Sequence, residues 1–278
     1  MPYDLIAVGD LMLDGALPAP IAGGRVHGRI ELRAGGSAAN AAFAAARLGA
    51  RAAVIGRVGA DAAGRLVAAE LAAAGVEPLL ARDADAPTGC VVVVGGASIV
   101  ADPGASIRLV PEDLPATLEA GAVLISGYTL LQPGPGAAAH AALERARTDC
   151  LAVDAASANL VAAFGAKRFF EATATAGVLF ANAEEARTLT GLDADGAAVA
   201  LARRYRVVCV KLGRSGAVAT TGGEIVRVEV QPVDRADTLG AGDAFAGGFL
   251  VSLSRGAELA VALRAGCDSA LSALLERD

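Results

Sequence analysis

The stretch Val233-Asp-Arg-Ala-Asp-Thr-Leu-Gly-Ala-Gly-Asp-Ala-Phe-Ala-Gly-Gly-Phe249 begins with polar residues, passes through two glycines and ends in an apolar helical pattern. A glycine turn that leads into a helix leaves its first backbone N–H groups without helical partners, here those of Gly240, Ala241 and Gly242. Because the helix dipole adds partial positive charge at this end, the turn predicts an anion site. A tight turn with an acid at a favourable helix position explains the same residues without any ligand.

Asp243 lies in the first turn of the predicted helix, beside the predicted anion site. Transfer of a phosphoryl group to a hydroxyl requires this combination of groups. The amides stabilise the charge on the moving phosphate, and the carboxylate accepts the hydroxyl proton. The stretch therefore predicts a site for phosphoryl transfer.

Strand and helix patterns alternate regularly along most of the chain. Earlier in the chain, residues 4–9 and 52–56 predict strands and residues 62–74 predict a helix. Repeated strand–helix units predict an α/β fold with a mostly parallel central sheet and helices on both faces. From residue 111 onward we expect strands near 122–126, 150–154, 177–181 and 206–211, and helices near 134–147, 183–190, 196–204, 241–254 and 257–275.

Two glycine pairs predict hairpins outside this alternation. Gly95-Gly96 predicts a hairpin over residues 90–101, and Gly222-Gly223 predicts another over residues 216–230. An exposed strand is also expected near residues 26–32. We expect insertions at about 15–33 and 88–108 to form a small β-sheet lid, and the chain 1–278 to be a single domain.

Composition excludes several classes of protein. The chain has 278 residues, 54% of them hydrophobic, which favours a packed globular core. A net charge of -6 without a dense Lys/Arg cluster argues against nucleic-acid binding. The four cysteines are widely spaced in apolar runs, which indicates buried thiols rather than a metal site. Neither a signal peptide nor a membrane span is predicted, so we expect a cytoplasmic protein.

The run Asp237-Thr-Leu-Gly-Ala-Gly-Asp243 resembles the C-terminal signature of the ribokinase (PfkB) family of carbohydrate and nucleoside kinases at every fixed position. That signature is Asp-Thr-x-Gly-Ala-Gly-Asp. The resemblance extends over nearly the whole chain and implies a ribokinase-like fold with a lid. Four further segments resemble the family in the same order, namely 8–14, 34–42, 180–185 and 210–217.

The resemblance implies that the two N-terminal segments bind the acceptor. Asp14 matches an acid that bonds two sugar hydroxyls, and Asp10 is a second candidate. Gly35, Gly36 and Asn40 match the family's Gly-Gly-x-x-x-Asn motif, where the glycines let the backbone approach the sugar and the Asn bonds its hydroxyls. A helix turn capped by Ser37 and an exposed loop acid explain the same residues without a ligand.

The later segments resemble the nucleotide side of the family's site. Asn182 and Glu185 match a pair that orders Mg²⁺ through its waters, although the same spacing is that of a capping box. Nucleotide contacts are implied for Lys211, Gly213, Gly216, Gly240 and Gly242, and solvated turn charge explains Lys211 equally well.

By resemblance, Asp243 is the general base, the amides of Gly240, Ala241 and Gly242 form the anion hole, and a monovalent cation such as K⁺ lies near Asp237 and Thr238. The implied function is an ATP-dependent kinase, with Mg²⁺, that phosphorylates a primary hydroxyl of a sugar. A nucleoside kinase of the same family and a non-catalytic nucleotide or sugar sensor are the alternatives. A homodimer through the lid is also implied.

Two features depart from the family pattern. The sequence ends at Asp278, soon after the last expected helix, so we expect an altered adenine pocket and cation loop. The hairpin around Gly95-Gly96 is short, which leaves open how the lid closes over the acceptor.

Overall fold

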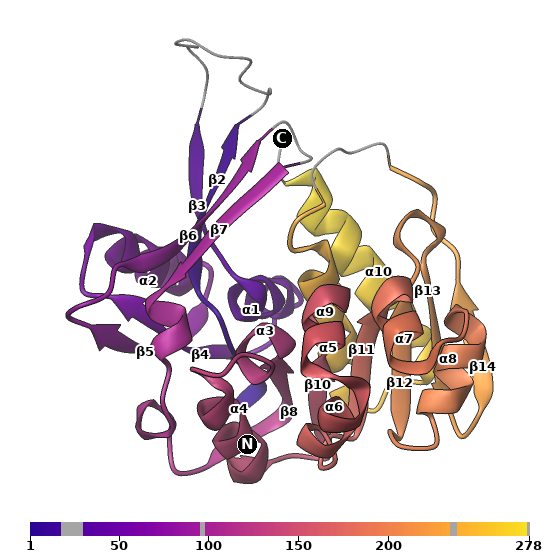
Figure 1. Ribbon diagram of the computed structural model, residues 1–278. Helices are drawn as coiled ribbons and strands as arrows, with labels where there is room; N and C mark the ends of the chain where they lie inside the picture. Colours follow the sequence, from indigo (N-terminus) through magenta and orange to yellow (C-terminus); the bar gives the residue numbers. More distant parts are fainter. Residues whose placement is uncertain (18–29, 95–97, 234–237, 277–278) are drawn as a thin grey trace.

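The computed structural model describes residues 1–17, 30–94, 98–233 and 238–276. Among these residues the larger sheet has ten strands in the order β14-β13-β12-β11-β10-β8-β1-β4-β5, with β9 paired to β8 (Figure 1). The strands from β5 to β12 are parallel, whereas β13 and β14 are antiparallel to their neighbours. The predicted α/β class with a mostly parallel sheet is therefore confirmed. The strands are β1 (Tyr3–Val8), β4 (Ala52–Gly59), β5 (Val76–Asp83), β8 (Leu118–Ser126), β9 (Ala146–Arg147), β10 (Cys150–Asp154), β11 (Val178–Asn182), β12 (Val207–Lys211), β13 (Ala217–Thr221) and β14 (Glu224–Val228).

Helices cover both faces of the larger sheet. Alternate residues of β1 enter different cores, because successive strand side chains point to opposite faces. Leu5 and Ala7 pack with α1 (Ser37–Arg47), α2 (Ala62–Ala73), α9 (Ala241–Ser254) and α10 (Leu259–Leu275). Ile6 and Val8 belong to the core formed with α3 (Gly127–Leu130), α4 (Gly136–Arg145), α5 (Ala158–Phe164), α6 (Ala166–Ala172), α7 (Ala183–Thr190) and α8 (Ala194–Leu201).

A second, smaller sheet has the order β3-β2-β6-β7 and projects from one end of the molecule (Figure 1). It consists of β2 (Met12–Leu17), β3 (Glu31–Gly35), β6 (Thr88–Val94) and β7 (Ser98–Gly104). The antiparallel pairing of β6 with β7 confirms the first predicted hairpin, and that of β13 with β14 confirms the second. The expected strand near 26–32 lies mostly outside the described residues, and β3 begins at Glu31.

Hydrogen bonds fix the base of the small sheet against the larger one. The hydroxyl of Ser106, in the short 3-10 helix Ala105–Arg108 after β7, accepts from the Leu11 N–H at 3.2 Å and donates to the Leu11 carbonyl at 2.8 Å. The buried Asp83 carboxylate at the end of β5 accepts from Arg57 and from Arg108. Both ends of the β6–β7 hairpin are thereby tied to the larger sheet.

The elements that were not predicted include β5, β2, α5 and α6. The strand β5 contains Pro78 and several charges, and a proline is tolerated there because β5 is the edge strand. The strand β2 carries Gly15 at its centre, which weakens its strand pattern. The helices α5 and α6 are only seven residues each, too short for a clear helical period.

No helix in the described ranges combines the length and apolar character needed to cross a bilayer.

The helices α1 and α9 approach each other closely at Gly247. A Cβ atom built there would lie 2.1 Å from the carbonyl oxygen of Ala41 on α1. These two helices also carry Asn40 and Asp243, so their spacing sets the distance between two candidate site residues.

We predict that Gly247→Ala lowers the free energy of unfolding by about 1–3 kcal/mol, because the added methyl group overpacks the α1–α9 contact. Urea denaturation followed by circular dichroism measures this change. Gly177→Ala is the matched control, since a Cβ there meets nothing closer than 3.9 Å. Equal urea midpoints for Gly247→Ala and Gly177→Ala would show that α1 and α9 accommodate the added methyl group without a loss of stability.

Candidate active site

Polar side chains gather where the central strands of the larger sheet end. Ser126, Asp154, Asn182 and Lys211 are the last residues of β8, β10, β11 and β12, and Asp10 follows β1 by two residues. Parallel neighbours bring these ends to one edge, which is where ligands bind in open α/β sheets. The glycine-led start of α9 lies over the same edge.

The start of α9 is built on a left-handed residue. Gly240 has φ of 77° and precedes the first helical residue, and a Cβ there would lie 2.7 Å from the Asn40 amide nitrogen. A side chain is therefore excluded by both conformation and space. The Ala241 N–H donates to the Thr238 carbonyl at 3.3 Å, so this amide closes the turn. The expectation that all three amides of residues 240–242 lack partners is wrong for Ala241.

Asp243 and Asn40 meet across the molecule. The Asn40 side-chain amide on α1 donates to the Asp243 carboxylate on α9 at 3.1 Å. Burial raises the pKa of Asp243 to about 7, and the charge of Asp154 raises it further against the opposing effects of Asn40 and Lys211. Asp243 as a residue is half-buried, and its carboxylate is directed at Asn40.

Lys211 is the cation of the cluster. Its ammonium donates to the Asp154 carboxylate at 2.6 Å, and both side chains are mostly buried. Burial alone would lower the pKa of Lys211, but Asp154 and Glu185 raise it above its usual range. A Cβ at Gly242 would lie 3.2 Å from the Lys211 nitrogen, so the charge sits directly under the start of α9.

Asn182 and Glu185 form the capping box that their spacing allows. The Glu185 N–H donates to the Asn182 side chain at 2.8 Å, and the Glu185 carboxylate accepts from the Asn182 N–H at 2.7 Å and its amide at 2.6 Å. Glu185 is only 2% exposed, and burial followed by the charge of Asp154 raises its pKa to about 7. A cation near this carboxyl would relieve that shift.

The donor set fits Mg²⁺ reached through water rather than a closed protein cage. Both oxygens of Glu185 already accept hydrogen bonds, and no group of three or more His, Cys, Asp or Glu in the described residues is arranged to hold a metal. Mg²⁺ keeps several waters and needs few protein ligands. Asn182 and Glu185 could therefore bind the waters that surround Mg²⁺ rather than the ion itself.

Asp10 organises the start of α1. Its carboxylate accepts from the Ser37 N–H at 3.0 Å, from the Ser37 hydroxyl, and from the Ser126 hydroxyl at 3.0 Å. The two serine hydroxyls lie 2.6 Å apart. Asp10 therefore fixes the first residues of α1 through Ser37. Asp14, in contrast, lies in the small sheet.

Asp14 lies in β2 of the small sheet and is buried, which excludes the alternative of an exposed loop acid. It stands in register opposite Arg33 on β3. A Cβ at Gly35 would lie 2.1 Å from its carboxylate, so Asp14 fills the space beside Gly35. Asp14, Gly35, Gly36 and Asn40 thus form one continuous corner.

The remaining predicted residues are less central. Gly213 and Gly216 bound the 3-10 turn directly after Lys211, where both have positive φ. Thr238 contributes its carbonyl to the turn before α9. Asp237 lies outside the described residues, so the predicted cation pair with Thr238 has one described member.

Three site residues were missed. Asp154 ends a predicted strand, and an acid at that place was the available signal. Ser126 has the same signal, whereas nothing in the sequence marks Tyr128. Burial raises the pKa of Tyr128 to about 12, and the charges of Asp243, Asp10, Glu185 and Asp154 add to this shift.

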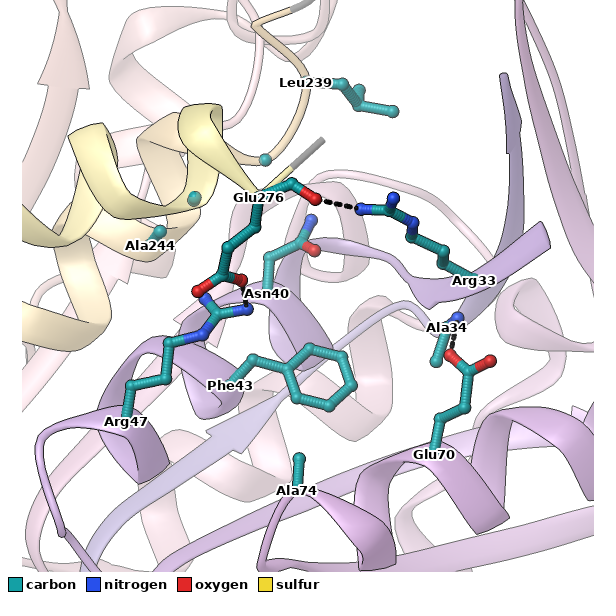
Figure 2. Close-up of a pocket in the computed structure, with 12 residues that line it drawn as sticks. Arg33, Ala34, Asn40, Phe43, Arg47, Glu70, Ala74, Leu239, Ala244 and Glu276 are labelled. Atoms are coloured by element: carbon teal, nitrogen blue, oxygen red, sulfur yellow. Dashed lines mark hydrogen bonds and ion pairs between the residues drawn. The ribbon is translucent and has the colours of Figure 1, made fainter. Parts of the chain in front are cut away.

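A cavity of about 240 Å³ adjoins the Asn40 side of this cluster. Figure 2 shows it between the side chains of Asn40 and Phe43 on α1, Arg33 on β3 and Glu276 after α10. Gly240 and Ala244 of α9 line it from the Asp243 side. The cavity therefore lies between α1, the start of α9 and the base of the small sheet.

The fold and this arrangement define a phosphoryl-transfer class, and comparison with known proteins agrees. Residues 4–277 match the model of the pfkB family of carbohydrate kinases. The chain belongs to this family and is an ATP-dependent kinase of a sugar or nucleoside. The family assignment, the fold class and the enzyme class expected from the motifs are confirmed.

Individual relatives act on different substrates. A 2-dehydro-3-deoxygalactonokinase from Haloferax volcanii is 29% identical over 97% of this chain and 90% of its own. A fructokinase from Klebsiella pneumoniae is 30% identical over 89% of this chain and 82% of its own. The crystal structure of adenosine kinase from Sinorhizobium meliloti has a TM-score of 0.87 at 26% identity, covering 99% of this chain and 94% of that one. A Vibrio cholerae fructokinase with fructose, ADP and calcium bound has a TM-score of 0.79 at 26% identity, covering 98% and 93%.

The raised pKa of Asp243 makes a prediction about stability. Because the pKa of Asp243 is about 7 in the fold and 3.8 in its ordinary state, the folded chain binds more protons than the unfolded chain between these two pH values. The ionised carboxyl therefore destabilises the fold above pH 7, and this effect diminishes as the pH falls. We predict that Asp243→Asn raises the Tm by about 2–4 °C at pH 8 and by less at pH 5.

Asp4→Asn serves as the control with the opposite sign. The backbone N–H of Arg51 lowers the pKa of Asp4, so losing this charge should lower the Tm at pH 8. Differential scanning calorimetry at both pH values measures the two variants. A lower Tm for Asp243→Asn at pH 8 would contradict the assigned cause of the pKa shift.

Proposed function

We propose that this chain transfers the γ-phosphoryl group of ATP to a primary hydroxyl of a sugar, with Asp243 as the general base. The observation that carries the proposal is the half-buried Asp243 carboxyl in the first turn of α9, bonded to Asn40 and above Lys211. The acceptor oxygen forms the new bond to phosphorus as the bond to ADP breaks, and Asp243 takes the hydroxyl proton. A pKa of about 7 suits this role, because a base works best near the operating pH.

The start of α9 is proposed as the anion hole. The helix dipole and the backbone of Gly240, Ala241 and Gly242 favour negative charge there, and Lys211 adds a buried cation beneath the turn. The corrected role of the Ala241 amide, which closes the turn, leaves Gly240 and Gly242 as the principal amides of this proposal. Removing one such donor typically reduces the rate by about 10²–10³.

Asn182, Glu185, Lys211, Gly213 and Gly216 are proposed as the nucleotide side, because they follow adjacent strands β11 and β12. Bound near Asn182 and Glu185, Mg²⁺ would neutralise charge on the ATP phosphates. Thr238, with Asp237 outside the described residues, is proposed to border a monovalent cation such as K⁺.

Asp14, Gly35, Gly36 and Asn40 are proposed as the acceptor side. A carboxylate and an amide provide the acceptors and donors that sugar hydroxyls need. The small sheet carries Asp14 and Gly35 and is proposed to act as the lid, excluding water as a competing acceptor. Its exposed Leu32, Ile99 and Val100 support a homodimer formed through the lid.

A nucleoside acceptor is the second candidate, favoured by the TM-score of 0.87 to an adenosine kinase. Thermal-shift screening of sugars and nucleosides with a non-hydrolysable ATP analogue separates the two. We expect a sugar to raise the Tm most, because bound ligand stabilises the folded state. Stabilisation by nucleosides alone would exclude the sugar assignment.

We predict that Asp243→Asn reduces kcat by about 10²–10⁴ while ATP still binds, because only the proton acceptor is removed. A coupled assay for ADP gives the rate, and calorimetry gives ATP affinity. The exposed Asp268→Asn is the matched control and should retain full activity. Wild-type turnover by Asp243→Asn would rule out Asp243 as the base.

A further inference from the structure

The cavity beside Asn40 contains charge that the proposed phosphoryl transfer does not use. Arg47, at the end of α1, forms an ion pair with the Glu276 carboxylate. Arg33, on β3, donates to the Glu276 carbonyl at 2.8 Å (Figure 2). Two arginines from separate elements thus converge on one acidic residue at the end of the chain's last described helix.

The cavity adjoins the proposed acceptor position at Asn40. Asn40 lines it and also bonds Asp243, and Gly240 and Ala244 line it from the other side. Arg33 stands directly opposite Asp14 in the β2–β3 register, so both side chains lie on the same face of the small sheet. An acceptor held by Asp14 and Asn40 would therefore have Arg33 beside it.

Arg47 lines the same cavity as Asn40. Asn40, Phe43 and Arg47 have the i, i+3, i+7 spacing of one helix face, and all three line the cavity. The Arg47 guanidinium meets the Glu276 carboxylate, and the Phe43 ring lies between the side chains of Arg47 and Glu70 (Figure 2).

Glu276 is held weakly enough to be displaced. The Arg47 and Glu276 side chains are 41% and 48% exposed, and exposed ion pairs contribute only about 0–1 kcal/mol. Of the other acids near the cavity, Glu70 accepts from the Ala34 N–H at 2.6 Å and Glu31 pairs with Arg33. Withdrawal of Glu276 would leave Arg47 facing the cavity.

We propose that the acceptor sugar carries an acidic group, a carboxylate or a phosphate, which binds Arg47 and Arg33 in place of Glu276. The inference rests on the proposed function and names its substrate class. A volume of about 240 Å³ lies below the roughly 300–1,000 Å³ of drug-sized sites, which fits a molecule the size of one sugar. Arginine suits this role because its planar fork binds both carboxylate and phosphate in two-point contacts.

The test compares matched acceptors. Glucose, galactose and ribose are each assayed beside their aldonate and their 1-phosphate, with ATP and Mg²⁺ in excess. We expect kcat/KM at least about tenfold higher for an acidic form than for its parent sugar, since hydrogen bonds to charged groups contribute about 1.5–3 kcal/mol. Preference for the aldonate or for the 1-phosphate identifies which anion is used. Equal or better use of the neutral sugars would overturn the inference and leave the proposed function standing.

Two variants with opposite effects separate anion binding from damage to the fold. Arg47→Met should reduce the ratio of acidic to neutral kcat/KM by about 10–100-fold, mostly through KM. Glu276→Gln should raise that ratio, because the competing carboxylate is lost. Arg51→Met, whose guanidinium pairs with Asp4 at the opposite end of β1, is the surface control. A fall in the ratio for both Arg47→Met and Glu276→Gln would overturn the inference.

A binding measurement keeps this inference distinct from the proposed function. Inorganic phosphate should raise the Tm of the wild type and of Glu276→Gln by more than that of Arg47→Met, which keeps only the proposed anion hole at the start of α9. If no acceptor is phosphorylated and this pattern is still seen, the proposed function fails and the anion site remains. If acceptors are phosphorylated and phosphate stabilises all variants equally, the anion site is wrong.

Discussion

The contact between Asn40 and Asp243 joins parts of the chain that are 203 residues apart. It exists because α1 and α9 pack closely enough that Gly247 has no room for a side chain, and because Gly240 leaves space for the Asn40 amide. Gly240 and Gly247 therefore determine the position of the Asp243 carboxyl relative to Asn40. They bring the start of one helix within hydrogen-bond reach of another, and the half-buried carboxyl between them acquires a pKa near neutrality.

The larger sheet concentrates negative charge at one edge. Asp10, Asp154, Glu185 and Asp243 lie at this edge, and the buried cation Lys211 bonds Asp154. Burial, followed by the charge of Asp154, raises the pKa values of Glu185 and Asp243, so a cation bound at this edge would lower them. In the proposed function, Mg²⁺ bound near Asn182 and Glu185 would supply positive charge at this edge.

Local sequence predicted the parallel sheet, both hairpins and the glycine-led start of α9, since each depends on patterns within a few residues. It did not predict that Asp14 belongs to the small sheet, because β2 contains a central glycine and is defined by pairing with β3 and β6. The Asn182–Glu185 spacing indicated a capping box and a metal site alike, and the structure contains the capping box. The Lys211–Asp154 pair and the approach of Tyr128 arise from the order of strands, which no local pattern encodes.

Asp10 and Asp14 are four residues apart, yet one belongs to the edge of the larger sheet and the other to the small sheet. Leu11 lies between them, and the Ser106 hydroxyl holds both its N–H and its carbonyl. The bonds to Leu11 therefore mark the boundary between the two sheets, because the next residue, Met12, already pairs with β3 and β6. Asp10 is fixed with the start of α1 and Asp14 with the small sheet, so a displacement of the small sheet would move Asp14 and leave Asp10 beside Ser37.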